Sequence, residues 1–128
     1  MPTTGRKFGD MGEQIAASFL VNKGYRIIDR NYQRPWGEID IVARKKKLLI
    51  FCEVKTRNAR NVNHHLPEQS VNAAKVKKLH KICRSYLYEM RLSDNQSWRI
   101  DVLSVIIDMG TKKARVRHFE NAIWESQY

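Results

Sequence analysis

Gly37-Glu38-Ile39-Asp40 and Phe51-Cys52-Glu53-Val54-Lys55-Thr56 are the two segments that decide the fold expected of this sequence. Apolar and polar residues alternate in both, as in half-buried strands whose side chains point to opposite faces. The link Arg44-Lys45-Lys46-Lys47 is short and charged, so an antiparallel hairpin is the simplest connection. A turn centred between its last two lysines places Asp40 directly opposite Glu53.

Two acids and a lysine on adjacent strands are the residue types of a metal-dependent phosphodiester-cleaving site. Directly opposed carboxylates, with Cβ atoms roughly 4.5 to 5.5 Å apart, destabilise a hairpin unless a cation offsets their charge. Carboxylates suit Mg²⁺, which keeps several of its waters, and Mn²⁺ is the expected substitute. The pattern therefore predicts Asp40 and Glu53 as metal ligands. Lys55, on the same face as Glu53, would orient the attacking water and stabilise charge on the phosphate.

A plainer interpretation of the same residues is an exposed hairpin whose acids only pair with lysines, as most surface carboxylates do. Against it, Glu53 follows the apolar run Leu48-Leu49-Ile50-Phe51-Cys52, which is typical of a central strand. A charge placed there costs free energy unless it is paired or metal-bound. The pattern favours the metal site and leaves the surface pair as the alternative.

Four ordered motifs resemble those of the YraN family of small uncharacterised bacterial proteins, within the PD-(D/E)XK nuclease superfamily. They extend over nearly the whole chain and are Gly9-Asp10-Met11-Gly12-Glu13-Gln14-Ile15-Ala16, Gly37-Glu38-Ile39-Asp40, Glu53-Val54-Lys55-Thr56-Arg57 and Arg99-Ile100-Asp101-Val102. The resemblance implies an α/β fold, the restriction-endonuclease-like three-layer sandwich, with a central mixed sheet flanked by helices. The implied fold is similar to that of archaeal Holliday-junction resolvases. No settled activity comes with the family.

The resemblance also implies two further site residues. Glu13 would be an additional site acid on the first helix, and Lys75 would lie near the site and contact a phosphate. Taken without the resemblance, Glu13 is an ordinary first-turn acid favoured by the helix dipole, and Lys75 is a solvated lysine. The sequence departs from the family at Asn61-Val62-Asn63-His64-His65, where relatives carry a glycine-containing segment.

The net charge of +11 on 128 residues indicates a polyanionic partner, because Lys and Arg neutralise phosphates. Nucleic acid is the leading candidate, with DNA favoured over RNA, and basic residues that only confer solubility are the alternative. We expect Arg57, Lys75 and Lys78 to contact the backbone. A membrane surface is not expected, because the helices need their apolar faces for the core.

Size and composition bound the rest of the expectation. The chain, 1–128, is predicted to be a single nuclease-like domain, with a homodimer as one route to cutting two strands. No secretory or membrane-spanning segment is apparent, so the expected location is cytoplasmic. Cys52 and Cys83 are predicted to be buried small apolar residues, and no Cys-x-x-Cys zinc spacing occurs.

Hydrophobic periodicity and turn residues predict the order helix, three strands, helix, two strands. Asp101 is expected to be a structural acid that pairs with a lysine or arginine. His64 and His65 are expected in a loop, either solvated or bound to metal or phosphate. The predicted segments are a helix over 10–23 capped by Gly24, a strand over 25–28, a turn over 31–36, the hairpin, a helix over 67–90, strands over 98–107 and 114–119, and a short helix over 121–126.

Together these observations predict a Mg²⁺-dependent nuclease that acts on DNA, including branched or structured forms. A non-catalytic nucleic-acid-binding protein that keeps the same fold is the second hypothesis. It would bind in a salt-sensitive way with no dependence on metal. A basic scaffold for an acidic protein partner is the third.

Overall fold

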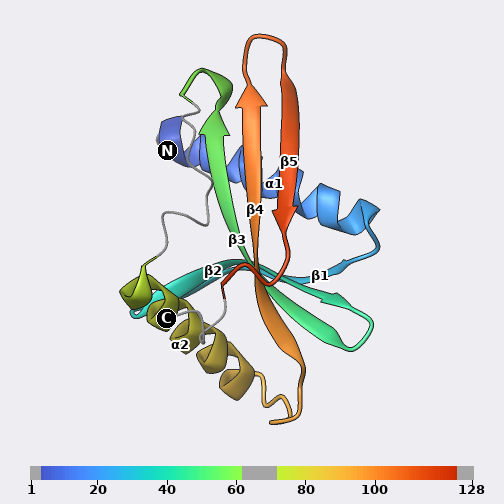
Figure 1. The fold of residues 1–128 in the computed structure, drawn as a ribbon, viewed down its shortest axis with the longest axis vertical. Coiled ribbons are helices and arrows are strands. Elements are labelled where there is room, and N and C mark those ends of the chain that lie inside the picture. The colour runs from blue at the N-terminus through green and yellow to red at the C-terminus, as the bar shows by residue number, and fades with distance from the viewer. Residues whose placement is uncertain (1–3, 62–71, 124–128) are drawn as a thin grey trace.

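A computed structural model describes residues 4–61 and 72–123, and in it a five-stranded sheet lies between two helices (Figure 1). The strands are ordered β1-β2-β3-β4-β5. Only β3 and β4 run parallel, and the other neighbours are antiparallel. The predicted element order and mixed sheet are confirmed. The elements are α1 (Thr4–Asn22), β1 (Arg26–Arg34), β2 (Gly37–Lys45), β3 (Leu48–Asn58), the 3-10 helix η1 (Ala59–Asn61), α2 (Ala73–Glu89), β4 (Trp98–Asp108) and β5 (Lys113–Phe119).

The hairpin of β2 and β3 has the predicted register. Ile41 lies opposite Cys52, and pairing continues to the turn, so Asp40 and Glu53 are the next positions outward. The two strands part at this point: β2 continues along β1, and β3 continues along β4. The Asp40 carboxylate accepts a hydrogen bond from the Val54 N–H at 2.7 Å. An acid side chain thus binds the backbone where the ladder opens.

Two hydrophobic clusters cover opposite faces of the sheet. One joins α1 to the sheet through residues such as Leu20, Ile41 and Leu103. The other joins α2 to the sheet through residues such as Ile82 and Phe51. The helices therefore form the outer layers of a restriction-endonuclease-like three-layer sandwich, as predicted.

Strand β2 twists sharply at the site. Ile39 belongs to the cluster under α2, whereas Ile41 belongs to the cluster under α1. Residues two apart in a regular strand share a face, so the backbone must turn between them. Asp40 is the residue at this turn, which places its carboxylate between the two helical layers.

Helix α1 begins at Thr4 rather than at residue 10, so Glu13 lies beyond its first turn and is not the first-turn acid of the alternative interpretation. The end of α1 agrees with the sequence, and the start of α2 differs. Gly24 ends α1 with φ of +93°, and the Tyr25 N–H donates to the Leu20 carbonyl at 2.9 Å, as in a glycine C-terminal cap. Helix α2 begins at Ala73, because the Asn72 side chain accepts from the Lys75 N–H. Residues 67–71 of the predicted helix lie outside the described residues.

Two local predictions need correction. The predicted turn over 31–36 is wrong up to Arg34, because β1 continues that far. Tyr32 is 5% exposed and packs into the core under α2, so burial of its ring outweighs the turn-like composition around it. The predicted short helix over 121–126 is absent from its described part, Asn121–Ile123. The remainder of that segment lies outside the structure described.

Cys52 and Cys83 are buried free thiols, as predicted. Burial raises the pKa of both thiols above the ordinary value. Both therefore act as small apolar residues of the core. Neither described helix is long and apolar enough to cross a membrane.

Candidate active site

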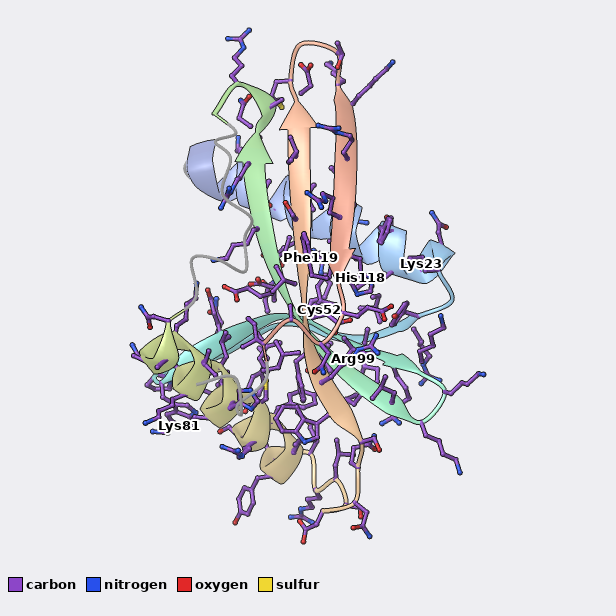
Figure 2. All side chains as sticks on the ribbon, in the orientation of Figure 1. Lys23, Cys52, Lys81, Arg99, His118 and Phe119 are labelled. Atoms are coloured by element: carbon purple, nitrogen blue, oxygen red, sulfur yellow. The ribbon has the colours of Figure 1, made fainter. Side chains whose placement is uncertain are left out.

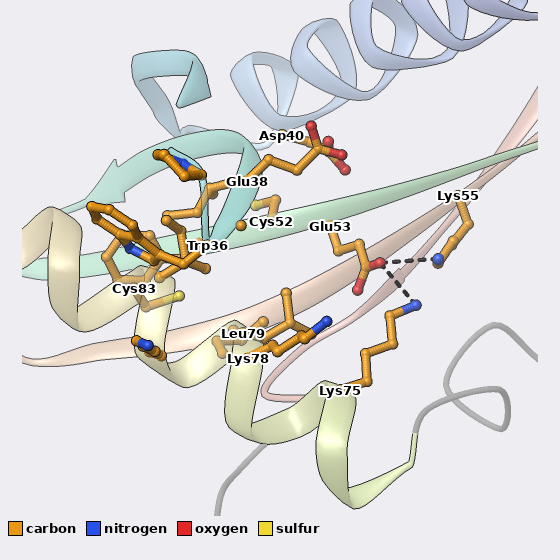
Figure 3. Close-up of a pocket in the computed structure, with 17 residues that line it drawn as sticks. Trp36, Glu38, Asp40, Cys52, Glu53, Lys55, Lys75, Lys78, Leu79 and Cys83 are labelled. Carbon is orange, nitrogen blue, oxygen red and sulfur yellow. Dashed lines mark ion pairs between the residues drawn. The ribbon is translucent and has the colours of Figure 1, made fainter. Parts of the chain in front are cut away.

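Glu53 shares one of its carboxylate oxygens between two lysines (Figure 3). The Nζ atom of Lys55 lies 2.9 Å from Glu53 Oε1, and that of Lys75 lies 3.3 Å from the same oxygen. Lys55 follows Glu53 by two residues on the same face of β3, whereas Lys75 comes from the first turn of α2. Strand and helix thus converge on one carboxylate, and Lys75 lies where the family resemblance placed it.

The pKa values of the two lysines shift in opposite directions beside this shared partner. Burial acts to lower the pKa of Lys55, but its contacts with Lys75 and Glu53 raise that pKa overall. Burial and the contact with Lys55 lower the pKa of Lys75, against the opposing effect of Glu53. Lys55 therefore holds its proton more firmly, and Lys75 is the ammonium that loses its proton more readily.

Asp40 and Glu13 form the acidic side of the site. Burial raises the pKa of Asp40 to about 6, opposed by its hydrogen bond from Val54 and reinforced by nearby acids that include Glu53. Burial and, to a smaller extent, the Asp40 charge raise the pKa of Glu13 to about 7, against the lowering effect of Arg30. The distance from Arg30 Nη2 to Glu13 Oε1 is 4.0 Å. Helix α1 thus brings Glu13 near the opening of the β2–β3 ladder.

Two buried carboxylate oxygens lack hydrogen-bond partners within the described part of the chain. They are Glu13 Oε1 and Glu53 Oε2. Buried polar atoms in folded proteins are nearly always satisfied by protein, water or a bound group. Glu13 Oε1 has Arg30 Nη2 at 4.0 Å, so the clearer position for a cation is Glu53, which has one oxygen on two lysines and the other unsatisfied.

Asp40 and Glu53 suit a hydrated Mg²⁺ ion better than a metal whose ligands all come from the protein. Within residues 4–61 and 72–123, no three Asp, Glu, His or Cys side chains form a ready metal cage. Mg²⁺ does not require one, because it commonly uses one or two carboxylates and keeps several waters. The donor set present here therefore suits a hydrated hard cation.

A groove of about 730 Å³ contains Asp40, Glu53 and Lys55 and runs between the sheet and α2 (Figure 3). Lys75 and Lys78 of α2 line it as well. At one end the Trp36 indole N–H donates to Ser85 Oγ at 3.1 Å, which fixes an exposed aromatic ring against α2. The groove thus combines acids, ammonium groups and an apolar floor.

The predicted site residues fall into groups. Asp40, Glu53, Lys55 and Lys75 meet in the groove, Lys78 lines it, and Glu13 borders it from α1. Arg57 is not a lining residue and lies further along β3. His64 and His65 lie outside the described residues.

Two residues near the site, Glu38 and Arg30, were not predicted from the sequence. Glu38 lines the groove, and its period-two relation to Asp40 was a usable signal. Arg30 faces Glu13 from the part of β1 beyond its predicted end. No local signal indicated that position, because the contact joins different elements.

Asp101 has a structural role, as predicted. It is fully buried and accepts from Arg99 Nε at 2.9 Å and from the Asn121 N–H at 2.8 Å. His118 Nε2 lies 2.7 Å from its other oxygen. Arg99 and His118 lie near the centre of the molecule (Figure 2). The acid thus ties β4 to β5, and its arginine partner is one of the two residue types predicted.

Two features define the class of protein. One is the mixed sheet with helices on both faces, and the other is the set Asp40, Glu53 and Lys55 where two strands separate. The chain is a restriction-endonuclease-like protein of PD-(D/E)XK type.

Sequence comparisons identify the family within this class. The profile of "Uncharacterised protein family UPF0102" matches residues 12–105. A UPF0102 protein of Syntrophotalea carbinolica is 45% identical over 114 residues, which is 89% of each chain. One of Alkaliphilus oremlandii is 39% identical over 118 residues, or 91% of this chain and 97% of the relative. The chain belongs to the UPF0102 family, the YraN family of the resemblance.

A solved structure also matches at a lower level. It is described as "The structure of Pyrococcus Furiosus SfsA in complex with Ca2+". Identity is 16% and the TM-score is 0.41, over 91% of this chain. The chain spans 63% of the length of that SfsA chain.

Proposed function

We propose that the protein is a divalent-metal-dependent nuclease that hydrolyses phosphodiester bonds of DNA, including branched or structured forms. The observation that carries the proposal is the state of Glu53: one oxygen contacts Lys55 and Lys75, and the other is buried without a hydrogen-bond partner among the described residues. Asp40 lines the same groove. An acid pair beside two ammonium groups is suited to a phosphate and its counterion.

The residues divide the chemistry among them. Asp40 and Glu53 would hold Mg²⁺, which supplies Lewis-acid stabilisation and a bound water of lowered pKa. Lys55 places an ammonium at the Glu53 carboxylate, where it can donate to the attacking water or to a phosphate oxygen. Lys75 reaches the same point from α2 and is free to bind a phosphate oxygen once Glu53 has another partner. Glu13, with a pKa of about 7, can exchange a proton with water near neutral pH.

The groove walls would hold the nucleic-acid backbone. Lys78 and Lys81 line the groove on the α2 side. Point charges of this kind neutralise phosphates without reading sequence. The proposed substrate is therefore chosen by shape and charge, with little dependence on base sequence.

Cleavage of labelled linear, single-stranded and four-way-junction DNA, with RNA counterparts, tests the proposal. Wild type is compared with Glu53→Ala, Lys55→Ala and the matched surface variant Lys47→Ala, in Mg²⁺, Mn²⁺ or EDTA. We expect cuts that require metal, disappear in both site variants and persist in Lys47→Ala. Nucleic acid bound without cleavage by wild type in either metal would contradict the nuclease proposal.

A non-catalytic nucleic-acid-binding role is the second candidate, and one observation favours it. Both lysines already contact Glu53 Oε1. In this second role the carboxylate holds the two ammonium groups in place and binds no metal. This role predicts salt-sensitive binding that EDTA leaves unchanged. Isothermal titration with Mn²⁺ separates the two candidates, because only the nuclease requires a metal site that Asp40→Asn and Glu53→Gln weaken.

A further inference from the structure

The face of the sheet that bears Glu53 continues beyond the site as a basic surface. Residues paired across neighbouring strands point to the same face of a sheet. Lys55 of β3 pairs with Ser104 of β4, which pairs with Arg117 of β5. Lys55 and Arg117 therefore flank a small buried serine on the face that carries the site.

The next rows repeat this arrangement further from the site. Arg57 pairs with Ile106, which pairs with Arg115. Lys113 lies two residues before Arg115 and so shares its face. The alternation in Lys113-Ala114-Arg115-Val116-Arg117 was the sequence signal for this surface. We call the set the basic sheet face: Lys55, Arg57, Lys113, Arg115 and Arg117.

The β5 part of the basic sheet face is open to solvent. Lys113, Arg115 and Arg117 are exposed. The opposite face of the sheet is the one covered by α1, and α2 lies toward the other end of the strands (Figure 1). Within the described chain, Arg115 and Arg117 have no ion-pair partner, and the Arg117 guanidinium lies 5.2 Å from the centre of the Phe119 ring.

The acid at the far end of this surface is already engaged. Asp108 pairs with Lys113 across the strands, but its Oδ1 accepts from the Gly110 N–H at 2.9 Å and the Thr111 N–H at 3.2 Å. The carboxylate thus stabilises the β4–β5 turn. The exposed arginines remain available to an external anion.

The rows extend over a length that a short stretch of nucleic-acid duplex would cover. Each row is two residues from the next, about 6.7 Å along the strands, so the six steps from Val102 to Asp108 span about 20 Å. At 3.4 Å of helix rise per nucleotide, this length corresponds to about six base pairs. The aromatic residue on this face of β5, Phe119, packs against the core under α2 and against Arg117, so the exposed residues of the basic sheet face offer phosphate contacts.

We propose that the basic sheet face binds the phosphate backbone of a nucleic-acid duplex, which runs from Glu53 along β3, β4 and β5. The placement of a scissile bond at Glu53 rests on the proposed function. Binding of the duplex does not rest on the proposed function, because binding requires neither metal nor cleavage. The surface would hold one double-stranded arm of the substrate without reading its sequence.

Fluorescence anisotropy in EDTA tests this proposal with a labelled duplex of about 20 base pairs, titrated between about 50 and 200 mM NaCl. The test variant is Arg115→Gln/Arg117→Gln. Arg26→Gln/Lys47→Gln is the matched control, because it removes the same charge from exposed residues at the end where β1 begins and β2 turns into β3. Arg115→Lys/Arg117→Lys retains the charge, and circular dichroism confirms that each variant is folded.

We expect the test variant to bind the duplex at least about 10-fold more weakly, with a salt slope smaller by about 2, as for two lost phosphate contacts. The charge-matched control and the lysine variant should stay within about threefold of wild type. Equal losses in test variant and control would overturn the proposal. So would a wild type that binds polyglutamate as tightly as the duplex at the same salt, since the surface would then serve an acidic protein.

Discussion

Asp40 and Glu13 are carboxylates whose environment disfavours their charge. Burial is the largest cause of the raised pKa in both, and each also experiences the charge of a neighbouring acid. A structural acid would normally have its charge stabilised by its surroundings. The charges on these two residues therefore reduce the stability of the metal-free protein at neutral pH, as expected for carboxylates that would bind a cation.

The first prediction concerns pH and stability without metal. Raised folded-state pKa values mean that the folded protein binds more protons than the unfolded chain between about pH 4 and 7. The free energy of unfolding in EDTA should therefore fall as pH rises through this window and level off above it. For Asp40 the loss is on the order of 3 kcal/mol. Urea unfolding at about pH 5 and pH 8 should capture roughly half of this loss, because the rest of it falls below pH 5.

The matched variants make this test specific. Asp40→Asn keeps an oxygen that can accept from the Val54 N–H but removes the charge, so it should be more stable than wild type at about pH 8. Asp94→Asn, an exposed acid in the loop between α2 and β4, is the control. If the pH dependence of stability is identical in Asp40→Asn and wild type, the charge on Asp40 does not destabilise the folded protein, which contradicts the prediction.

The second prediction separates Lys55 from Lys75, which touch the same Glu53 oxygen. Lys55→Met should abolish kcat, because Lys55 is the ammonium that holds its proton beside the proposed nucleophile. Lys75→Met leaves that pair intact and removes a proposed phosphate contact, so it should raise KM by about 10-fold with a smaller change in kcat. Steady-state cleavage kinetics decide the matter. Equal losses of kcat in both variants would assign the lysines one shared role.

At the scale of elements, α1 approaches β3 unusually closely at Gly12. A Cβ atom built on Gly12 would lie 1.9 Å from Thr56 Oγ1 and 2.7 Å from Thr56 Cβ. Only a residue without a side chain fits at this contact. The close approach also brings Glu13, one residue later on α1, to the site.

The third prediction follows from this contact. Gly12→Ala must push α1 away from β3, and overpacking of this kind costs about 1–3 kcal/mol or more. Urea unfolding should show this loss. Thr56→Gly removes the clashing atoms, so the double variant should be more stable than the sum of the single effects. Gly9→Ala, where the added Cβ meets nothing within 4 Å, is the control and should not lose stability.

How far the sequence predicts each element depends on whether its signal is local. The β2–β3 register was predictable because alternation and a short charged link fix which residues oppose each other, and this brought Asp40 level with Glu53. The end of β1 was not predictable, since Tyr32 is buried by α2 while its neighbours are typical of a turn. The convergence of Lys75 on Glu53 required the resemblance, because no spacing rule connects α2 to β3.

At the scale of the whole molecule, the site lies where all three layers meet. Helix α1 supplies Glu13, the sheet supplies Asp40, Glu53 and Lys55, and α2 supplies Lys75. Strands β2 and β3 part at this point, which leaves room between the layers for a groove. The three-layer arrangement therefore assembles acids from one side and ammonium groups from the other around a single opening in the ladder.

The same sheet holds a buried acid with a different set of partners. Asp101 is buried in a network with Arg99 and His118, and Arg99 also donates to the Tyr25 hydroxyl at 3.1 Å. The network joins β4, β5 and the start of β1. Both carboxylate oxygens of Asp101 have hydrogen-bond or ion-pair partners from its own strand and from β5 and the residues after it, so its role differs from that of Asp40, which has one backbone donor.

The fourth prediction uses this contrast to separate structural from functional acids. Asp101→Asn breaks a buried pair and should destabilise the protein by about 3–5 kcal/mol, while the molecules that remain folded keep their affinity for Mn²⁺. Asp40→Asn should do the reverse: it should stabilise the metal-free protein near neutral pH and lose Mn²⁺ affinity. Urea unfolding combined with Mn²⁺ titration gives both quantities. Loss of Mn²⁺ affinity in folded Asp101→Asn would place that acid in the metal site and contradict its structural assignment.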